Sequence, residues 1–125
     1  MMENFTHDDI RDALRPIASL ISKSEKARTR LTPGTWQHTM LGENLKALRV
    51  ASAMMDEEIG DTNDCAPDDL KEALRAFESM INRTENAKMK FKEGTSQYSL
   101  QRNRLRALRI AEALITKELE GKNNA

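Results

Sequence analysis

The sequence predicts an all-α fold, namely a tandem duplication of a helical hairpin that forms an up-down four-helix bundle with pseudo-twofold symmetry. The main observation is that residues 8–59 align without a gap on residues 68–119. Of these 52 pairs 19 are identical, whereas chance would give roughly 3 or 4. The composition agrees, because Leu, Ile, Met and Ala are plentiful and only five of the 125 residues are aromatic, a balance that favours helices over strands.

The first helix of each repeat is predicted from apolar residues spaced three and four positions apart. In repeat one they are Ile10, Ala13, Leu14, Ile17, Leu20, Ile21, Ala27 and Leu31, and each has an apolar counterpart 60 positions later. Thr6 can cap the first of these helices, and Asp8 and Asp9 complement its dipole. Pro67 suits the first turn of the equivalent helix.

Pro16 conflicts with the first predicted helix, because a proline in a helix interior removes a backbone hydrogen bond and clashes with the preceding turn. We expect a kink or a break near Arg15. Ala76 stands at the equivalent place in repeat two, where the helix should run straight.

Each predicted hairpin turns at a glycine followed by a threonine, at Gly34-Thr35 and Gly94-Thr95. Glycine can adopt the left-handed conformation that ends one helix, and threonine can cap the next. The second helix of repeat one carries apolar residues over roughly 220° of its circumference, more than the roughly 100° of an ordinary surface helix. The second helices should therefore be the central ones.

The whole chain, residues 1–125, is expected to be one domain with repeats at 8–59 and 68–119, a linker at 60–67 and a tail at 120–125. Four antiparallel helices would place both hairpin tips at the same end. The alternative is an open pair of hairpins that completes its core by forming a symmetric homodimer.

Charge is predicted to separate along this bundle although the chain as a whole is neutral, with 20 basic and 20 acidic residues. Neutrality argues against a uniformly basic nucleic-acid binder. The tip segments 22–44 and 82–104, however, hold ten basic residues against four acidic ones. The helix dipole accounts for most of this pattern, but not for Arg102 and Arg104, which lie where a helix begins and a positive charge is unfavourable.

The candidate partner-binding residues gather at these tips and along one face of the second helices. Arg102, Arg106 and Arg109 share a face, with Lys46 and Arg49 at the last two positions in repeat one. Arg104 should point into the apolar arc, where we expect Glu25 or Glu85 to pair with it. The remaining candidates at the tips are Trp36, Gln37, His38, Lys88, Lys90, Lys92, Gln97 and Tyr98.

No pattern in the sequence predicts catalysis, a cofactor or a metal site, so we expect a protein that is not an enzyme. His7 and His38 have no ligand cluster around them, and Cys65 is the only cysteine. The N-terminus does not resemble a secretory signal, and no apolar stretch approaches the ~20 residues of a membrane span. A cytoplasmic protein without a membrane contact is expected.

Two functions fit these observations. The first is a non-enzymatic binding or adaptor protein that recognises a macromolecular partner, in the first place a protein, through a basic hairpin-tip end. The alternative is a nucleic-acid-associated protein that contacts phosphates with Arg102, Arg106, Arg109 and the tip lysines. The protein is expected to be a monomer or a symmetric homodimer.

Overall fold

The computed structural model describes residues 5–56 and 66–123, which form four helices and no strand. The helices are α1 (His7–Thr29), α2 (Trp36–Met55), α3 (Pro67–Met89) and α4 (Ser96–Asn123). The predicted helical class is confirmed for this part of the chain. The helix α4 extends past the second repeat, into the predicted tail, and ends at Asn123. Cys65 and most of the predicted linker lie outside the described residues.

The helix boundaries follow the local signals in the sequence. Thr6 caps α1 in a capping box, in which its hydroxyl accepts from the Asp9 backbone N–H and Asp9 accepts from the Thr6 backbone N–H. Pro67 is the first residue of α3. Gly34 and Gly94 have φ angles of 94° and 90°, the left-handed conformation that glycine allows.

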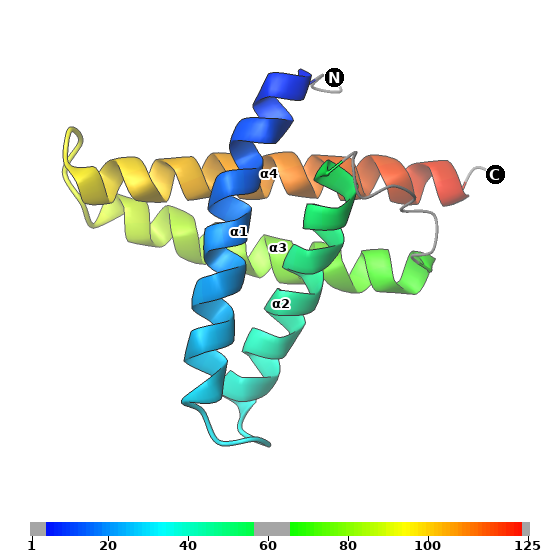
Figure 1. Cartoon of the computed structure of the whole chain (residues 1–125), viewed down its shortest axis with the longest axis horizontal. Coiled ribbons are helices and arrows are strands. Elements are labelled where there is room, and N and C mark those ends of the chain that lie inside the picture. Colours follow the sequence, from blue (N-terminus) through cyan, green and yellow to red (C-terminus); the bar gives the residue numbers. More distant parts are fainter. Residues whose placement is uncertain (1–4, 57–65, 124–125) are drawn as a thin grey trace.

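Pro16 lies inside α1, which continues without a break from His7 to Thr29. The expected break is therefore absent. The first turns of α1 lean away from the rest of the helix where it passes α4 (Figure 1), as expected of a helix that contains a proline.

The helices form two hairpins, α1–α2 and α3–α4, that lie across one another (Figure 1). The central helices are α2 and α4, as the sequence predicts. They contact each other, and each of them also packs on both α1 and α3. The outer helices α1 and α3 make no contact with each other. The two tips point in different directions, so the expected common tip end is not formed (Figure 1).

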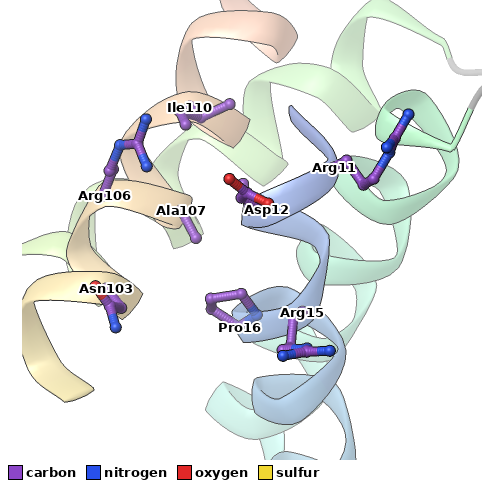
Figure 2. A pocket seen from close by; sticks show the side chains of 9 residues that line it. Arg11, Asp12, Arg15, Pro16, Asn103, Arg106, Ala107 and Ile110 are labelled. Atoms are coloured by element: carbon purple, nitrogen blue, oxygen red, sulfur yellow. The ribbon is translucent and has the colours of Figure 1, made fainter. Parts of the chain in front are cut away.

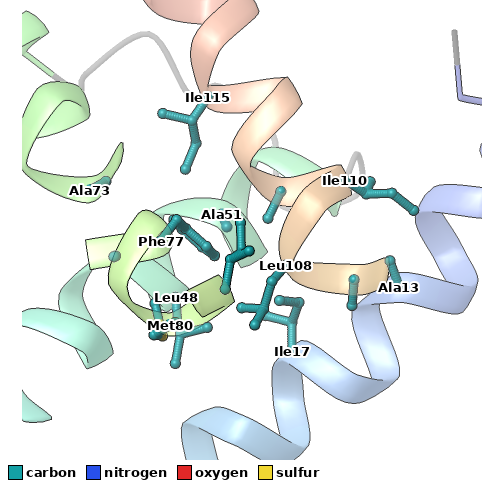
Figure 3. Packing of buried hydrophobic residues seen from close by; sticks show 14 of the residues in the cluster. Ala13, Ile17, Leu48, Ala51, Ala73, Phe77, Met80, Leu108, Ile110 and Ile115 are labelled. Carbon is teal, nitrogen blue, oxygen red and sulfur yellow. The ribbon is translucent and has the colours of Figure 1, made fainter. Parts of the chain in front are cut away.

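The distribution of buried residues gives a physical reason for this crossing. In α2 all buried residues lie between Asn44 and Met55, and in α4 they lie from Leu105 onward. Ile17 of α1 and Phe77 of α3, which are 60 positions apart, are fully buried in this core (Figure 3). The tip segments offer no buried apolar rows, so aligning them would bury little surface and would bring two basic ends together.

Candidate binding surface on the second hairpin

Four of the cations expected to face a partner are held in ion pairs. Between the hairpins, Lys46 Nζ lies 3.3 Å from Asp69 Oδ1, and Arg106 Nη2 lies 3.0 Å from Asp9 Oδ1. The two pairs are equivalent in the repeats, because Arg106 lies 60 positions after Lys46 and Asp69 lies 60 positions after Asp9. In one pair the cation comes from the first hairpin, and in the other it comes from the second.

The other two pairs lie within the hairpins. Arg49 Nη2 lies 2.7 Å from Glu25 Oε2, and Arg109 pairs with Glu85, 60 positions later in each case. All eight side chains are partly exposed, so solvent screening makes each pair only a small contribution to the stability of the fold. Their main effect is to fix the direction of the four cationic side chains.

The contacts of two of these charged groups shift their pKa values. The pKa of Asp9 is lowered, first by the hydrogen bond from the Thr6 backbone and then by the Thr6 hydroxyl and Arg106. The pKa of Lys46 is raised, first by its hydrogen bond to Asp69 and then by the charges of Asp69 and Glu72. Both groups are therefore held in their charged forms at neutral pH.

The prediction that Arg104 pairs with Glu25 or Glu85 is wrong. Glu25 and Glu85 are engaged by Arg49 and Arg109 instead. The Arg104 Nε is buried and has no hydrogen-bond partner among the described residues. The sequence predicted that Arg104 points inward, but it did not predict which helix faces it once the hairpins cross.

The equivalent positions 28 and 88 are used in different ways. In the first hairpin, the Arg28 guanidinium lies against Gly42, where a Cβ atom would come within 2.9 Å of its Nη2. Arg28 Nε also donates to the His38 carbonyl at 3.4 Å. The Arg28 guanidinium therefore packs on the α2 backbone of its own hairpin.

In the second hairpin, the Lys88 Nζ instead lies 5.9 Å from the centre of the Tyr98 ring, within cation–π range. Position 102, which matches Gly42, carries an arginine. Arg102 is exposed and forms no ion pair with a described carboxylate. The second hairpin thus presents a cation where the first has a glycine that Arg28 covers.

A recess of about 300 Å³ brings these cations together. Its basic lining is Lys88 of α3 with Arg102, Arg106 and Arg109 of α4. Its apolar lining is Phe5, Leu105 and Ile110. The structure thus gathers four of the candidate residues in one place, but it leaves Lys46 and Arg49 on the other hairpin.

A larger crevice of about 500 Å³ lies between α1 and α4 (Figure 2). It is lined by Asp12, Arg15 and Pro16 of α1, with Asn103 and Arg106 of α4 among the facing residues. A second crevice of about 270 Å³, between α2 and α3, includes the equivalent positions Glu43, Glu72, Arg75 and Ala76. Sequence reasoning did not find either crevice, because both are formed by the crossing of the hairpins.

Large exposed apolar side chains among the described residues lie only at the tips. Trp36 at the first tip is 69% exposed; at the second tip Met89, Phe91 and Leu100 are 79%, 39% and 45% exposed. Gln37 at the first tip and Gln97, Lys90 and Lys92 at the second are also exposed, and His38 and Tyr98 are half-buried. The Gln97 Oε1 accepts from the Ser96 hydroxyl at 3.4 Å.

Comparison of the chain with protein-family models, curated proteins and solved structures finds no match. No helix in the described part of the chain is long and apolar enough to cross a membrane. Within the same residues, no group of three or more His, Cys, Asp or Glu side chains could hold a metal ion.

Phe5 is the residue of this surface that sequence reasoning missed. A signal for it exists, because Phe5 directly precedes the capping residue Thr6, and an apolar residue there often packs back on the helix. Here Phe5 packs against the hydrophobic core and lines the recess beside α4.

Proposed function

We propose that this protein is a non-enzymatic binding or adaptor protein whose second hairpin tip recognises an acidic segment of a protein partner. The observation that carries this proposal is the coincidence of exposed apolar and cationic side chains at one place. Met89, Phe91 and Leu100 are exposed there, and Met89 and Phe91 alternate with Lys90 and Lys92 in the sequence. Such a surface suits a partner that offers apolar side chains among carboxylates.

Charge favours the second tip over the first. Residues 82–104 hold six basic and two acidic side chains, whereas residues 22–44 hold four and two. Of the two acidic residues at the second tip, Glu85 is already paired with Arg109. An acidic segment would therefore meet a net positive surface, which favours association and selects against basic partners.

The difference between the tips has a simple origin if the chain is a tandem duplication, as we propose. The hairpins would be related by an approximate twofold axis through the contact of α2 with α4. Support comes from the two ion pairs that join exchanged positions 60 residues apart and from the two crevices at equivalent positions. With one copy maintaining the scaffold, the other copy is free to acquire a binding surface.

The alternative, a nucleic-acid-associated protein, draws on the same cations. Its support is weaker, because Arg106 and Arg109 each have a carboxylate partner, which leaves few unpaired cations along α4 to contact a run of backbone phosphates. Lys46 and Arg49 are likewise paired. A monomer is favoured over a homodimer, since the apolar face of the central helices is buried within one chain.

Selection of binders from a library of displayed random peptides tests the proposal. We expect the full chain to enrich acidic peptides that contain large apolar residues, and we expect Met89→Thr combined with Phe91→Ser to abolish the enrichment. Met89→Thr installs the residue that repeat one has at position 29. Trp36→Ser, which gives the first tip the residue of Ser96, is the matched control and should leave the enrichment unchanged.

Two results would contradict the proposal. One is equal loss of enrichment in the Trp36→Ser control, which would place binding at the first tip or at no particular tip. The other is tight binding of a duplex or single-stranded oligonucleotide at low salt with a steep decline as salt is added, which would support the nucleic-acid alternative.

A further inference from the structure

The recess beside α4 differs from the exposed tip in being lined by four cations, two of which are oriented by a carboxylate partner. Arg102, Arg106 and Arg109 lie at positions i, i+4 and i+7 of α4 and so share one helix face. Asp9 orients Arg106 through a contact to Nη2, and Glu85 orients Arg109 in the same way. A guanidinium has five N–H donors, so each arginine retains donors for a ligand.

The charge of this recess remains positive after its internal ion pairs are counted. Four cations line it, and two carboxylates pair with two of them, which leaves a formal charge of +2. No described carboxylate forms an ion pair with Arg102 or Lys88. Like charges held together in this way favour a compact dianion over a single carboxylate.

The apolar lining and the volume of the recess limit the size and kind of chemical group that can carry the bound anion. Leu105 and Ile110 are buried, and Phe5 is half-buried. A recess of about 300 Å³ is at the small end of the range for ligand sites. It suits one side chain better than a run of nucleotides.

The first hairpin provides an internal comparison. The positions that match Lys88, Arg102 and Arg106 are Arg28, Gly42 and Lys46. Arg28 lies against Gly42, and Lys46 is paired with both Asp69 and Glu72. The first hairpin therefore turns Arg28 toward its own backbone and has no cation at the position of Arg102, whereas Lys88 and Arg102 of the second hairpin line the recess.

We propose that this recess binds a phosphate monoester carried by a side chain of the partner, so that the protein recognises a phosphorylated protein segment. A phosphate monoester carries a charge of about −1.5 to −2 at pH 7, which matches the formal charge of the recess. Arg102 and Lys88 would supply the free cations, and Arg106 and Arg109 would add oriented donors. A phosphodiester, with one charge for each phosphate, matches less well.

Titration with phenyl phosphate, followed by NMR of the backbone and arginine side chains of the full chain, tests this site. We expect shifts at Arg102, Arg106 and Lys88, and binding that strengthens as the pH rises through about 6, where the second proton of a phosphate monoester is lost. Arg102→Gln removes the charge but keeps a residue that favours helix formation in α4. It should weaken the affinity for phenyl phosphate at least about tenfold, the loss expected for a charge-assisted hydrogen bond.

The control variant is Arg30→Gln, which removes an exposed cation at the first tip and should leave phenyl phosphate binding unchanged. Three outcomes would overturn the inference. They are the absence of shifts at low salt, equal weakening in Arg30→Gln and Arg102→Gln, and tighter binding of a short thymidine oligonucleotide than of phenyl phosphate.

This inference rests on the proposed function only for the source of the phosphate, and the two experiments can fail separately. Enrichment of acidic peptides without phenyl phosphate binding would remove the phosphate site and keep the adaptor. Phenyl phosphate binding at Arg102 without any peptide enrichment would keep the site and remove recognition of a protein segment through the tip.

Discussion

At the scale of single residues, Phe77 and Ile17 occupy equivalent positions and both are fully buried. We expect Phe77→Ala to lower the free energy of unfolding by ~3–5 kcal/mol, because it removes apolar contacts and leaves a cavity where the hairpins meet. Denaturant unfolding measures this loss. The comparison variant is Phe91→Ala at the exposed tip, for which a change of only ~0.5 kcal/mol is expected; similar losses in both variants would contradict the packing described here.

Glu112 of α4 gives a prediction for pH dependence. Its pKa is raised, first by burial and then by the negative charge of Glu78 on α3. A carboxyl group whose folded-state pKa is raised binds its proton more tightly in the folded state. The free energy of unfolding is therefore lowered at a pH above the folded-state pKa, and this penalty disappears once the group is protonated in both states.

We therefore expect Glu112→Gln to stabilise the protein slightly at pH 7, because solvent screens part of the repulsion, and to have no effect near about pH 3. Thermal unfolding over this pH range measures the difference. Glu120→Gln, which alters an exposed carboxylate further along α4, serves as the control. A Glu112→Gln benefit that is the same at both pH values would contradict the electrostatic explanation.

At the scale of the elements, Pro16 makes α1 differ from α3. Ala76 holds the equivalent position in an uninterrupted helix of the same length. We expect Pro16→Ala to raise the free energy of unfolding by up to ~3 kcal/mol, because it restores a backbone N–H and removes the ring clash. The reverse change, Ala76→Pro, should lower it by a similar amount. If denaturant unfolding shows no gain for Pro16→Ala, the proline is accommodated without strain.

The elements were predictable where local chemistry decides them. The cap at Thr6, the first-turn Pro67 and the left-handed Gly34 and Gly94 depend on residues a few positions away. Helical periodicity also identified α2 and α4 as the central helices, because it records how much of each surface is apolar. It contains no information on the angle at which two such helices cross.

The site was predictable only in part for the same reason. The spacing of Arg102, Arg106 and Arg109 placed them on one face of α4, but their partners come from elsewhere, Asp9 from α1 and Glu85 from α3. Arg104 was expected to meet Glu25 or Glu85, which an up-down bundle with both hairpin tips at one end would allow. Contacts between hairpins depend on the crossing, so they could not be derived from one repeat at a time.

At the scale of the whole molecule, the ion pairs Lys46–Asp69 and Asp9–Arg106 connect the two hairpins at positions that are equivalent in the two repeats. A double-mutant cycle with Lys46→Ala and Asp69→Ala should give a small but favourable coupling energy at low salt, because the pair is solvent-exposed. High salt should reduce this coupling by screening. A cycle of Asp69→Ala with Lys117→Ala is the control, and coupling no larger than in this control would show that Lys46 does not hold the hairpins together.

The separation of α1 from α3 has a consequence for how the molecule opens. Each outer helix packs on both central helices but not on the other outer helix, so one of them can detach while the other stays in place. Such partial openings expose backbone amides to solvent without global unfolding. Amide hydrogen exchange should accordingly be slowest in the middle of α2 and α4 and faster in α1 and α3, with the outer helices exchanging independently of each other.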